Sequence, residues 1–325
     1  MKVAVYGAGA VGGLLAARLA RAGHEVSAIA RGATLEAIRA QGVRIVEGER
    51  TWSVPVAATD DPAALGPQEA VLLAVKAQAL EAVAARLRPL LGPDTAVVAA
   101  MNGVPWWFFD GFGGTLEGTR LRSVDPRGAI AEAIPARRVV GCVVHLAASG
   151  VGPGAARVGP GNRLILGEPA GGESPRVRAL AAALRAAAFD VEVSKRIQRD
   201  VWYKLWGNLT MNPVSALTGA TCDRIIDDPL VRRLCLDAMG EAARIGARFG
   251  CAIAESAEER LGLTRRMGEF KTSMLQDVEA GRTVELDALV AAVREIGALV
   301  GEPTPWTDAL LGLARLHARV HGLAP

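Results

Sequence analysis

The sequence predicts an α/β protein whose first part contains a parallel β-sheet and whose second part is entirely helical. Up to about residue 194, short apolar runs alternate with stretches of helical periodicity, and a glycine-rich turn joins the first run to the first helical stretch. Beyond Lys195 only long helical periodicity remains. Because 325 residues suffice for two domains of ordinary size, we expect one domain over residues 1–194 and another over residues 195–325.

The order of elements follows from the apolar pattern. A strand over Val3–Tyr6, a helix that ends at Gly23 and a strand over His24–Ala30 form a βαβ unit. Alternation of strands and helices predicts a parallel sheet with helices on both faces. Further strands are expected over 70–75, 95–101, 139–147 and 190–194, helices over 78–91 and 175–188, and a hairpin-like excursion over 149–172. The second domain should contain helices over 201–211, 230–249, 257–277 and 286–299, and a last helix after Pro305.

Composition excludes several classes of protein. The 37 basic and 34 acidic residues leave a net charge of +3, and aromatic residues make up 4%, which argues against a nucleic-acid-binding groove. The N-terminus has no signal-peptide pattern and no uncharged run is long enough to span a membrane, so we expect a cytoplasmic protein without a membrane partner. No metal is expected, because the four cysteines stand far apart in the sequence: Cys142, Cys222, Cys235 and Cys251.

The turn after the first strand has the spacing of a dinucleotide-binding fingerprint. Gly7 permits the tight bend, Gly9 lets the backbone approach a pyrophosphate and Gly12 allows the helix to pack closely. The start of the following helix then offers its backbone amides to the phosphates. The turn Gly7-Ala8-Gly9-Ala10-Val11-Gly12 is therefore expected to bind a dinucleotide in a Rossmann-type domain.

Two basic residues follow neighbouring strands of the predicted sheet. Where an NAD-binding protein normally offers an acidic side chain to the ribose, this chain has Arg31, whose guanidinium can pair with a 2′-phosphate. This favours NADP over NAD, although an exposed arginine is also ordinary surface. Lys76 follows the strand over 70–75 and fits either a cofactor contact or a solvated lysine at a helix start.

A second group of polar residues suggests a catalytic site. Asn102-Gly103 follows the strand over 95–101, where it fits either a contact to nicotinamide or substrate, or an ordinary turn. Lys204, Asn208 and Asn212 recur every four residues and share one face of a helix, which we expect Pro213 to end. The alternative is a polar face in solvent, but the apolar neighbours of this stripe favour a position beside a cleft.

These residue types suit the reduction of a ketone. A carbonyl that accepts hydride develops alkoxide charge and needs a proton donor, and burial lowers the pKa of a lysine toward neutrality. Further along the chain, Ser273 and Glu285 belong to a second polar stretch. Taken alone, Ser273 is an ordinary surface hydroxyl, and Glu285 at a helix start fits interaction with the helix dipole equally well.

Together these residues resemble the ketopantoate reductase family, also called 2-dehydropantoate 2-reductases, over nearly the whole chain. The resemblance rests on the glycine turn, Lys76 and Asn102-Gly103. Its most specific parts are two stretches: Lys204-Leu205-Trp206-Gly207-Asn208 with Asn212-Pro213, and Ser273-Met274-Leu275-Gln276-Asp277 with Glu285. The resemblance implies an N-terminal Rossmann domain, a helical C-terminal domain and NADPH-dependent reduction of 2-dehydropantoate to pantoate, a step of pantothenate biosynthesis.

The resemblance also implies roles for individual residues. Lys204 looks like the general acid, and Glu285 is similar to an essential carboxylate near the substrate and the lysine. Contacts to substrate or cofactor correspond to Asn102, Asn208, Asn212 and Ser273, and contacts to the NADPH phosphate correspond to Arg31 and Lys76.

Two departures from the family pattern bear on the substrate. The aromatic block Trp106-Trp107-Phe108-Phe109 follows Asn102, and Cys222 stands where some members have another substrate-binding asparagine. The aromatic block fits either core packing or the lining of a pocket for a bulkier 2-keto acid. The alternatives to a 2-dehydropantoate reductase are a paralogous reductase of another 2-keto acid, a different hydroxyacid or opine-type dehydrogenase, or a non-catalytic NADP-binding sensor. The helical domain has apolar faces that fit a homodimer seam as well as an internal core.

Overall fold

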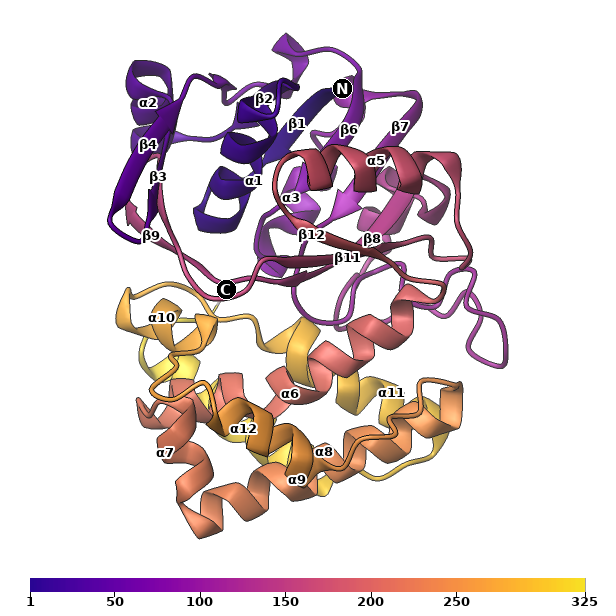
Figure 1. Cartoon of the computed structure of the whole chain (residues 1–325). Helices are drawn as coiled ribbons and strands as arrows, with labels where there is room; N and C mark the ends of the chain where they lie inside the picture. Colours follow the sequence, from indigo (N-terminus) through magenta and orange to yellow (C-terminus); the bar gives the residue numbers. More distant parts are fainter. Residues whose placement is uncertain (325) are drawn as a thin grey trace. The chain divides into compact units, whose positions relative to one another are not determined.

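Two compact units make up the computed structural model of the protein, which describes residues 1–324 (Figure 1). Unit 1 comprises Met1–Met101, Trp107–Phe112 and Arg127–Ile197. Unit 2 comprises Asn102–Trp106, Gly113–Pro126 and the chain from Gln198 onward. The sequence led us to expect a single division after residue 194, whereas the main division follows Ile197 and two short segments of the first half belong to the helical unit. Pro325, the last residue of the expected second domain, lies outside the described residues.

The larger sheet of unit 1 has eight strands within residues 1–324, in the order β12-β11-β8-β7-β6-β1-β2-β5. The order from β5 to β8 is that of a doubly wound nucleotide-binding sheet. All neighbouring strands are parallel except β8 and β11, so the predicted parallel sheet is confirmed apart from this pair. The bounds are β1 Lys2–Tyr6, β2 Glu25–Ile29, β5 Ala57–Thr59, β6 Gln68–Leu73, β7 Leu91–Ala99, β8 Val139–His145, β11 Arg163–Gly167 and β12 Asp190–Val193.

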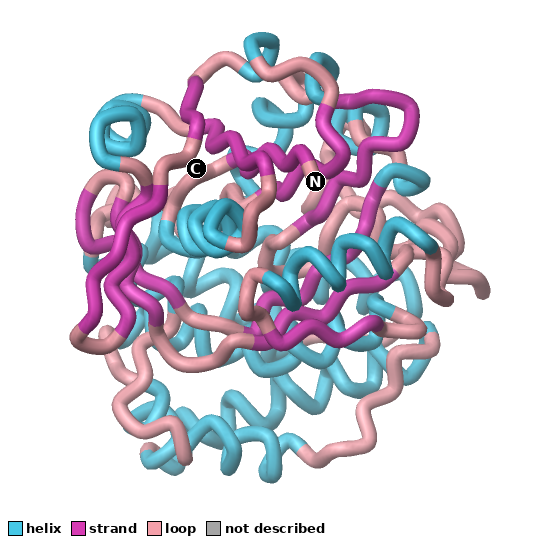
Figure 2. Tube along the Cα trace, turned by 45° about the horizontal axis from the view of Figure 1, so that its top comes forward, coloured by secondary structure: helices cyan, strands magenta, loops and turns pink. Residues whose placement is uncertain are grey.

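A smaller sheet accounts for the antiparallel pair. Its order is β4-β3-β10-β9, and the predicted excursion over 149–172 contains the hairpin of β9 and β10. Because this hairpin, rather than a crossover helix, connects β8 to β11, the chain returns in the opposite direction. Figure 2 shows the strands of the two sheets as separate groups. The bounds are β3 Val43–Glu47, β4 Arg50–Val54, β9 Ala148–Gly152 and β10 Ala155–Val158.

Helix α1 (Ala10–Arg21) packs against both sheets of unit 1. Its residue Leu15 belongs to one buried cluster with Val5 of β1 and Ile45 of β3. The helix predicted over 78–91 is wrong, because Pro89 cannot continue a helix and only the five residues of α3 are α-helical. The other helices of the unit are α2 (Gly32–Gln41), α3 (Leu80–Ala84), α4 (Ala129–Ala133) and α5 (Pro175–Ala186), with the 3₁₀ turns η1 (Pro62–Ala64), η2 (Ala77–Ala79), η3 (Arg88–Leu90) and η4 (Ala136–Arg138).

Unit 2 is helical, as predicted, but its helices begin and end differently. The helix predicted over 257–277 is wrong: it is interrupted where Gly268 adopts a φ of +70°, and a new helix begins after Thr272, whose side chain accepts a hydrogen bond from Leu275 N. The helix predicted over 286–299 begins with a π-helical turn. The elements are α6 (Ile197–Thr218), α7 (Cys222–Asp227), α8 (Pro229–Phe249), α9 (Ala257–Arg265), α10 (Ser273–Glu279), the π turn η5 (Asp287–Ala291), α11 (Ala292–Val300) and α12 (Pro305–Val320).

Helix α8 forms the centre of unit 2, where it packs against α7, α9, α11 and α12. Trp206 of α6 donates a hydrogen bond from its indole to Met239 O of α8 at 2.8 Å. The fully buried Glu241 accepts hydrogen bonds from Trp306 N, Thr307 N and the Thr307 hydroxyl, and so caps the start of α12. Within the described residues, no helix is both long and apolar enough to span a membrane.

Candidate active site

Two glycines of the turn after β1, Gly7 and Gly12, are in positions that only glycine allows. Gly7 has a φ of +94°, and a Cβ on it would lie 2.7 Å from Ala74 O. A Cβ on Gly12 would lie 2.0 Å from Gly7 O, so the third glycine lets α1 approach the turn. Gly9 is exposed, and a Cβ there would meet nothing within 4 Å. The side of Gly9 that faces solvent is therefore open to a ligand that approaches the backbone.

The start of α1 is suited to bind an anion. Gly9 is the N-cap residue, no side chain caps the helix and its first turn has no acidic residue. The backbone amides of this turn are therefore available to a phosphate group. Between the glycines, Ala8 is buried, whereas Ala10 and Val11 are half-buried.

Arg31 and Lys76 lie at the same edge of the sheet as the glycine turn. In the registers of β1 with its two neighbours, Tyr6 pairs with Ile29 of β2 and with Leu73 of β6. Because these three strands are parallel, the residues that follow them share one carboxyl edge. Arg31 is exposed at the start of α2, and Lys76 is half-buried at the start of η2. The structure thus brings together the residues that the sequence suggested for the cofactor.

Lys204 and Asn102 form the central contact of the second group of predicted residues. Lys204 Nζ donates a hydrogen bond of 2.6 Å to Asn102 Oδ1, and both residues belong to unit 2. Asn102 lies three residues beyond the end of β7, and Lys204 lies in α6. Both side chains are half-buried. An ammonium group is therefore held by an amide oxygen at the point where the chain leaves the sheet.

The polar stripe of α6 is not a surface in solvent. Asn208 is half-buried and Asn212 is only 4% exposed. The expectation that Pro213 ends the helix is wrong, because α6 continues to Thr218 and Asn212 lies within it. Pro213 cannot donate to the carbonyl four residues earlier, but the segment that follows it is buried up to Ala216 and keeps its helical path through packing.

Ser273 is the exposed first residue of α10. The residue before it, Thr272, is buried, and its hydroxyl lies 2.5 Å from the hydroxyl of Ser215 in α6. Ser215 in turn donates to Asn212 O at 2.9 Å. A buried pair of hydroxyl groups therefore fixes the start of α10 against the turn of α6 that carries Asn212. We did not expect this pair from the sequence, although a threonine three residues before Leu275 is a helix-capping signal.

Glu285 lies in the segment without regular structure that leads into the π turn η5, and it is half-buried. Next to it, Val284 N donates to Leu323 O at 3.0 Å. The segment of Asn102 reaches the same region, because Val104 N donates to Ala288 O at 2.8 Å. The fold therefore places Asn102, Lys204 and Glu285, which come from three distant parts of the chain, in one unit.

The aromatic block Trp106-Trp107-Phe108-Phe109 is part of the buried core. Trp107, Phe108 and Phe109 are each 1% exposed, and the rings of Phe108 and Phe109 meet edge to face with centroids 5.0 Å apart. Trp106 is buried as well. Of the two interpretations of this block, the burial favours packing over a pocket lining.

Cys222 is a buried, neutral thiol. Burial, and to a smaller extent the neighbouring Asp223, raise its pKa to about 11. Burial likewise raises the pKa of Cys235 to about 12. Both side chains are therefore protonated near neutral pH, and neither has the thiolate form that a nucleophile or metal ligand requires.

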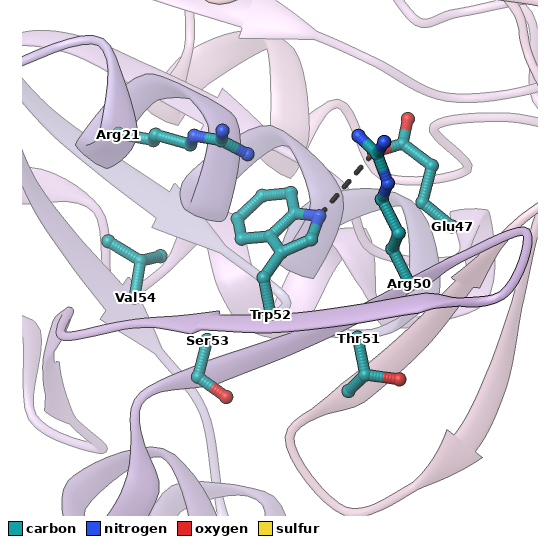
Figure 3. A pocket seen from close by; sticks show the side chains of 7 residues that line it. All are labelled: Arg21, Glu47, Arg50, Thr51, Trp52, Ser53 and Val54. Atoms are coloured by element: carbon teal, nitrogen blue, oxygen red, sulfur yellow. Dashed lines mark hydrogen bonds between the residues drawn. The ribbon is translucent and has the colours of Figure 1, made fainter.

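A surface hollow of about 660 Å³ beside β4 contains none of the predicted site residues (Figure 3). The guanidinium of Arg21 lies 4.9 Å from the centre of the Trp52 ring, and the indole donates a hydrogen bond to Glu47 at 3.4 Å. Thr51 and Ser53 point to the other side of the strand. Because the indole of Trp52 is already in contact with Arg21 and Glu47, we assign no ligand to this hollow.

Comparisons with known proteins agree with the architecture and with the motifs. Residues 3–106 match the family model described as ketopantoate reductase PanE/ApbA, and residues 196–318 match the model of its C-terminal part. The chain is 48% identical over 316 residues to a 2-dehydropantoate 2-reductase from Mesorhizobium japonicum, covering 97% of each protein.

Solved structures show the same fold. A crystal structure described provisionally as a ketopantoate reductase, from Ralstonia solanacearum MolK2, is 60% identical, with a TM-score of 0.95 over 99% of each chain. A D-mandelate dehydrogenase solved with NADH and anilino(oxo)acetate shares the fold alone, at 20% identity and a TM-score of 0.84, covering 99% of this chain and 100% of that chain. The chain therefore belongs to the ketopantoate reductase (PanE/ApbA) family and is an oxidoreductase that acts on a CH–OH group.

Proposed function

We propose that the protein reduces 2-dehydropantoate to pantoate with NADPH and thereby acts in pantothenate biosynthesis. The observation that carries this proposal is the hydrogen bond of 2.6 Å from Lys204 Nζ to Asn102 Oδ1. It holds the ammonium of Lys204 at Asn102, three residues beyond the end of β7, in a chain that is 48% identical to a 2-dehydropantoate 2-reductase. The net reaction adds a hydride to the carbonyl carbon and a proton to its oxygen.

Unit 1 would hold NADPH through its glycine turn. The close approach of Gly12 to Gly7 and the start of α1 leave room and amide donors for a pyrophosphate. Arg31 would bind the 2′-phosphate and Lys76 would add positive charge at the same edge of the sheet. When bound, the nicotinamide supplies the hydride. The D-mandelate dehydrogenase of similar fold was solved with NADH, so the preference of this chain for NADPH rests on Arg31.

Lys204 would deliver the proton from Nζ to the substrate oxygen. Its ammonium charge also stabilises the alkoxide that develops as hydride arrives. Asn102 would orient the ammonium by accepting a hydrogen bond from one of its three N–H groups. An arginine could not replace this lysine, because a guanidinium does not release its proton near neutral pH.

The remaining polar residues of unit 2 would bind the substrate. Asn208 and Asn212 lie on the same face of α6 as Lys204, and Ser273 is fixed near the Asn212 turn by the Ser215–Thr272 contact. We assign to Glu285 a role close to substrate and lysine, as the family resemblance implies. Its carboxylate would accept a hydrogen bond from a hydroxyl group of the substrate or keep the lysine charged.

A paralogous reductase of a different 2-keto acid is the second candidate. The burial of Trp107, Phe108 and Phe109 favours the smaller, more polar substrate, because these rings fill the core of unit 1. The neutral thiol of Cys222 in place of an amide is the observation that favours a different substrate. A non-catalytic sensor has no support from the comparisons.

The test is the oxidation of NADPH, followed by absorbance, with a panel of 2-keto acids. 2-Dehydropantoate, 2-ketoisovalerate and phenylglyoxylate cover a polar, a small apolar and an aromatic side chain. We expect the highest kcat/KM for 2-dehydropantoate. A higher value for either of the others would replace the proposed substrate, and no oxidation with any of them would refute the reductase.

We also propose that the chain forms a homodimer through α12. Trp306, Leu313, Leu316 and Val320 are 46–70% exposed and, with Ala309, recur at alternating spacings of three and four residues. This is the spacing of a helix–helix seam, and a stripe of this kind is complementary to itself about a two-fold axis. A second copy of the chain is therefore the occupant that fits it.

A further inference from the structure

Gly103 touches the π turn η5 more closely than any other residue type could. Its φ is +83°, and a Cβ on it would lie 2.6 Å from Ala288 O and 2.7 Å from Ala288 Cβ. The next residue, Val104, donates its amide to Ala288 O at 2.8 Å. The segment from Asn102 to Val104 is therefore docked, backbone to backbone, on one residue of the π turn.

The π turn is itself an unusual feature. Ala292 N donates to Asp287 O, five residues earlier, so this hydrogen bond encloses one more residue than the bond of an α-helix does. Ala288, Leu289 and Val290 are all buried, so the turn is held in place by packing. Insertions of this kind are frequent at functional sites. Here the turn begins two residues after Glu285, and its residue Ala288 provides the carbonyl on which the Asn102 segment docks.

We propose that Gly103 and Ala288 are positioning residues, which fix Asn102 so that its amide oxygen accepts the hydrogen bond from the ammonium of Lys204. The proposal rests on the proposed function. Gly103 has no side chain, and that of Ala288 is a buried methyl group, so neither can take part in the chemistry directly. The contact between Gly103 and Ala288 sets where Asn102 lies along α6. Because Glu285 leads into the same π turn, this contact also sets the distance from Asn102 to the carboxylate of Glu285.

A double-mutant cycle between Gly103→Ala and Asn102→Ala tests this proposal. If Gly103 acts through Asn102, the added methyl lowers kcat by about tenfold to a hundredfold in the parent, the range expected when a catalytic group is displaced by about 1 Å. In the Asn102→Ala background the same change should lower kcat by less than about threefold. The high-pH limb of the kcat profile should move in the same direction in both single variants.

The matched control is Gly301→Ala. Gly301 also has a positive φ, +71°, and lies in unit 2 at the end of α11, but a Cβ there would meet nothing within 4 Å. It carries the backbone strain of Gly103→Ala without the contact. We expect it to lower the Tm and to leave kcat and its pH profile at parental values.

Two outcomes would overturn the proposal. One is a parental kcat in Gly103→Ala, and the other is a double variant whose fold-loss in kcat equals the product of the fold-losses of the two single variants. If Gly103→Ala does not fold, Ala288→Val enlarges the other side of the same contact. Its loss of kcat should depend on Asn102 in the same way. Failure of both variants to fold would assign the contact to stability alone and refute a positioning role. The parent is assayed first, and an inactive parent refutes the proposed function. A parent active on another 2-keto acid allows the cycle to be measured with that substrate.

Discussion

Replacement of Lys204 by alanine is the most direct test of the proposed chemistry. Loss of a general acid lowers turnover by about two to four orders of magnitude, which corresponds to about 2.7–5.4 kcal/mol of transition-state stabilisation. The hydrogen bond to Asn102 contributes about 1 kcal/mol to the free energy of unfolding. Because Asn102 is only half-buried, water can replace the lost donor. The variant should therefore fold and lose activity.

The assay separates chemistry from binding. Single-turnover oxidation of NADPH gives the rate of the chemical step, and titration of NADPH fluorescence gives its Kd. We expect the rate to fall by at least a hundredfold while the Kd for NADPH changes by less than about threefold, because the glycine turn belongs to unit 1 and Lys204 to unit 2. Lys204→Arg should lose nearly as much, because it keeps the charge without an available proton.

Lys195→Ala is the matched control, since Lys195 is an exposed lysine outside the predicted site. It should have parental turnover. A Lys204→Ala variant that retains more than about a tenth of the parental rate would refute the assignment of this lysine as proton donor. Full activity of Lys204→Arg would instead reduce its role to electrostatic stabilisation.

Four further predictions concern the cofactor, stability and assembly. Arg31→Ala should weaken the binding of NADPH by about tenfold or more and the binding of NADH far less. An equal loss of affinity for both cofactors in fluorescence titrations would refute the phosphate contact. Glu241→Gln should lower the free energy of unfolding by about 2–4 kcal/mol in urea titrations, because a buried amide then faces the start of α12, whereas the exposed Glu258→Gln should not. Burial raises the pKa of Glu168, but hydrogen bonds from Arg176 and Ser174 outweigh it and hold this pKa below its ordinary value. Its contribution to stability is therefore present above the ordinary pKa of a glutamate and lost as the pH falls through the lowered value, so Glu168→Gln should flatten the acid side of the stability profile, and an unchanged slope would contradict this. Leu313→Glu with Leu316→Glu should convert a dimer to a monomer in light scattering, while Leu230→Glu, an exposed leucine on α8, should not; a monomeric parent would refute the α12 seam.

The central sheet could be predicted because its strands are buried on both faces. Such strands appear in the sequence as uninterrupted apolar runs, as in Val3–Tyr6. The smaller sheet could not be predicted in the same way. In β3 and β4 apolar residues alternate with exposed ones such as Arg44 and Ser53, and β3 pairs with β10 more than a hundred residues later. Nothing local to β3 or β4 indicates that pairing.

The candidate site could be predicted in part for a similar reason. A period of four residues placed Lys204, Asn208 and Asn212 on one face, because helical geometry is local. The bond from Lys204 to Asn102 joins residues 102 positions apart, and no spacing rule relates them. The expectation for Pro213 was wrong because tertiary packing outweighed a local preference. The contact of Gly103 with Ala288 is visible only in three dimensions, since both residues are small and apolar.

Unit 2 contains two short segments from the first half of the chain, and this constrains any attempt to recombine the protein with its relatives. In a chimera with a crossover after Ile197, the lysine of α6 would come from the relative, whereas Asn102 would still come from this protein. Residues 102–106 would then face a foreign π turn, and a single larger side chain at the position of Ala288 would separate the two parts. Chimeras that retain turnover should therefore be those that transfer residues 102–106 and 113–126 together with the helices, as one inherited block.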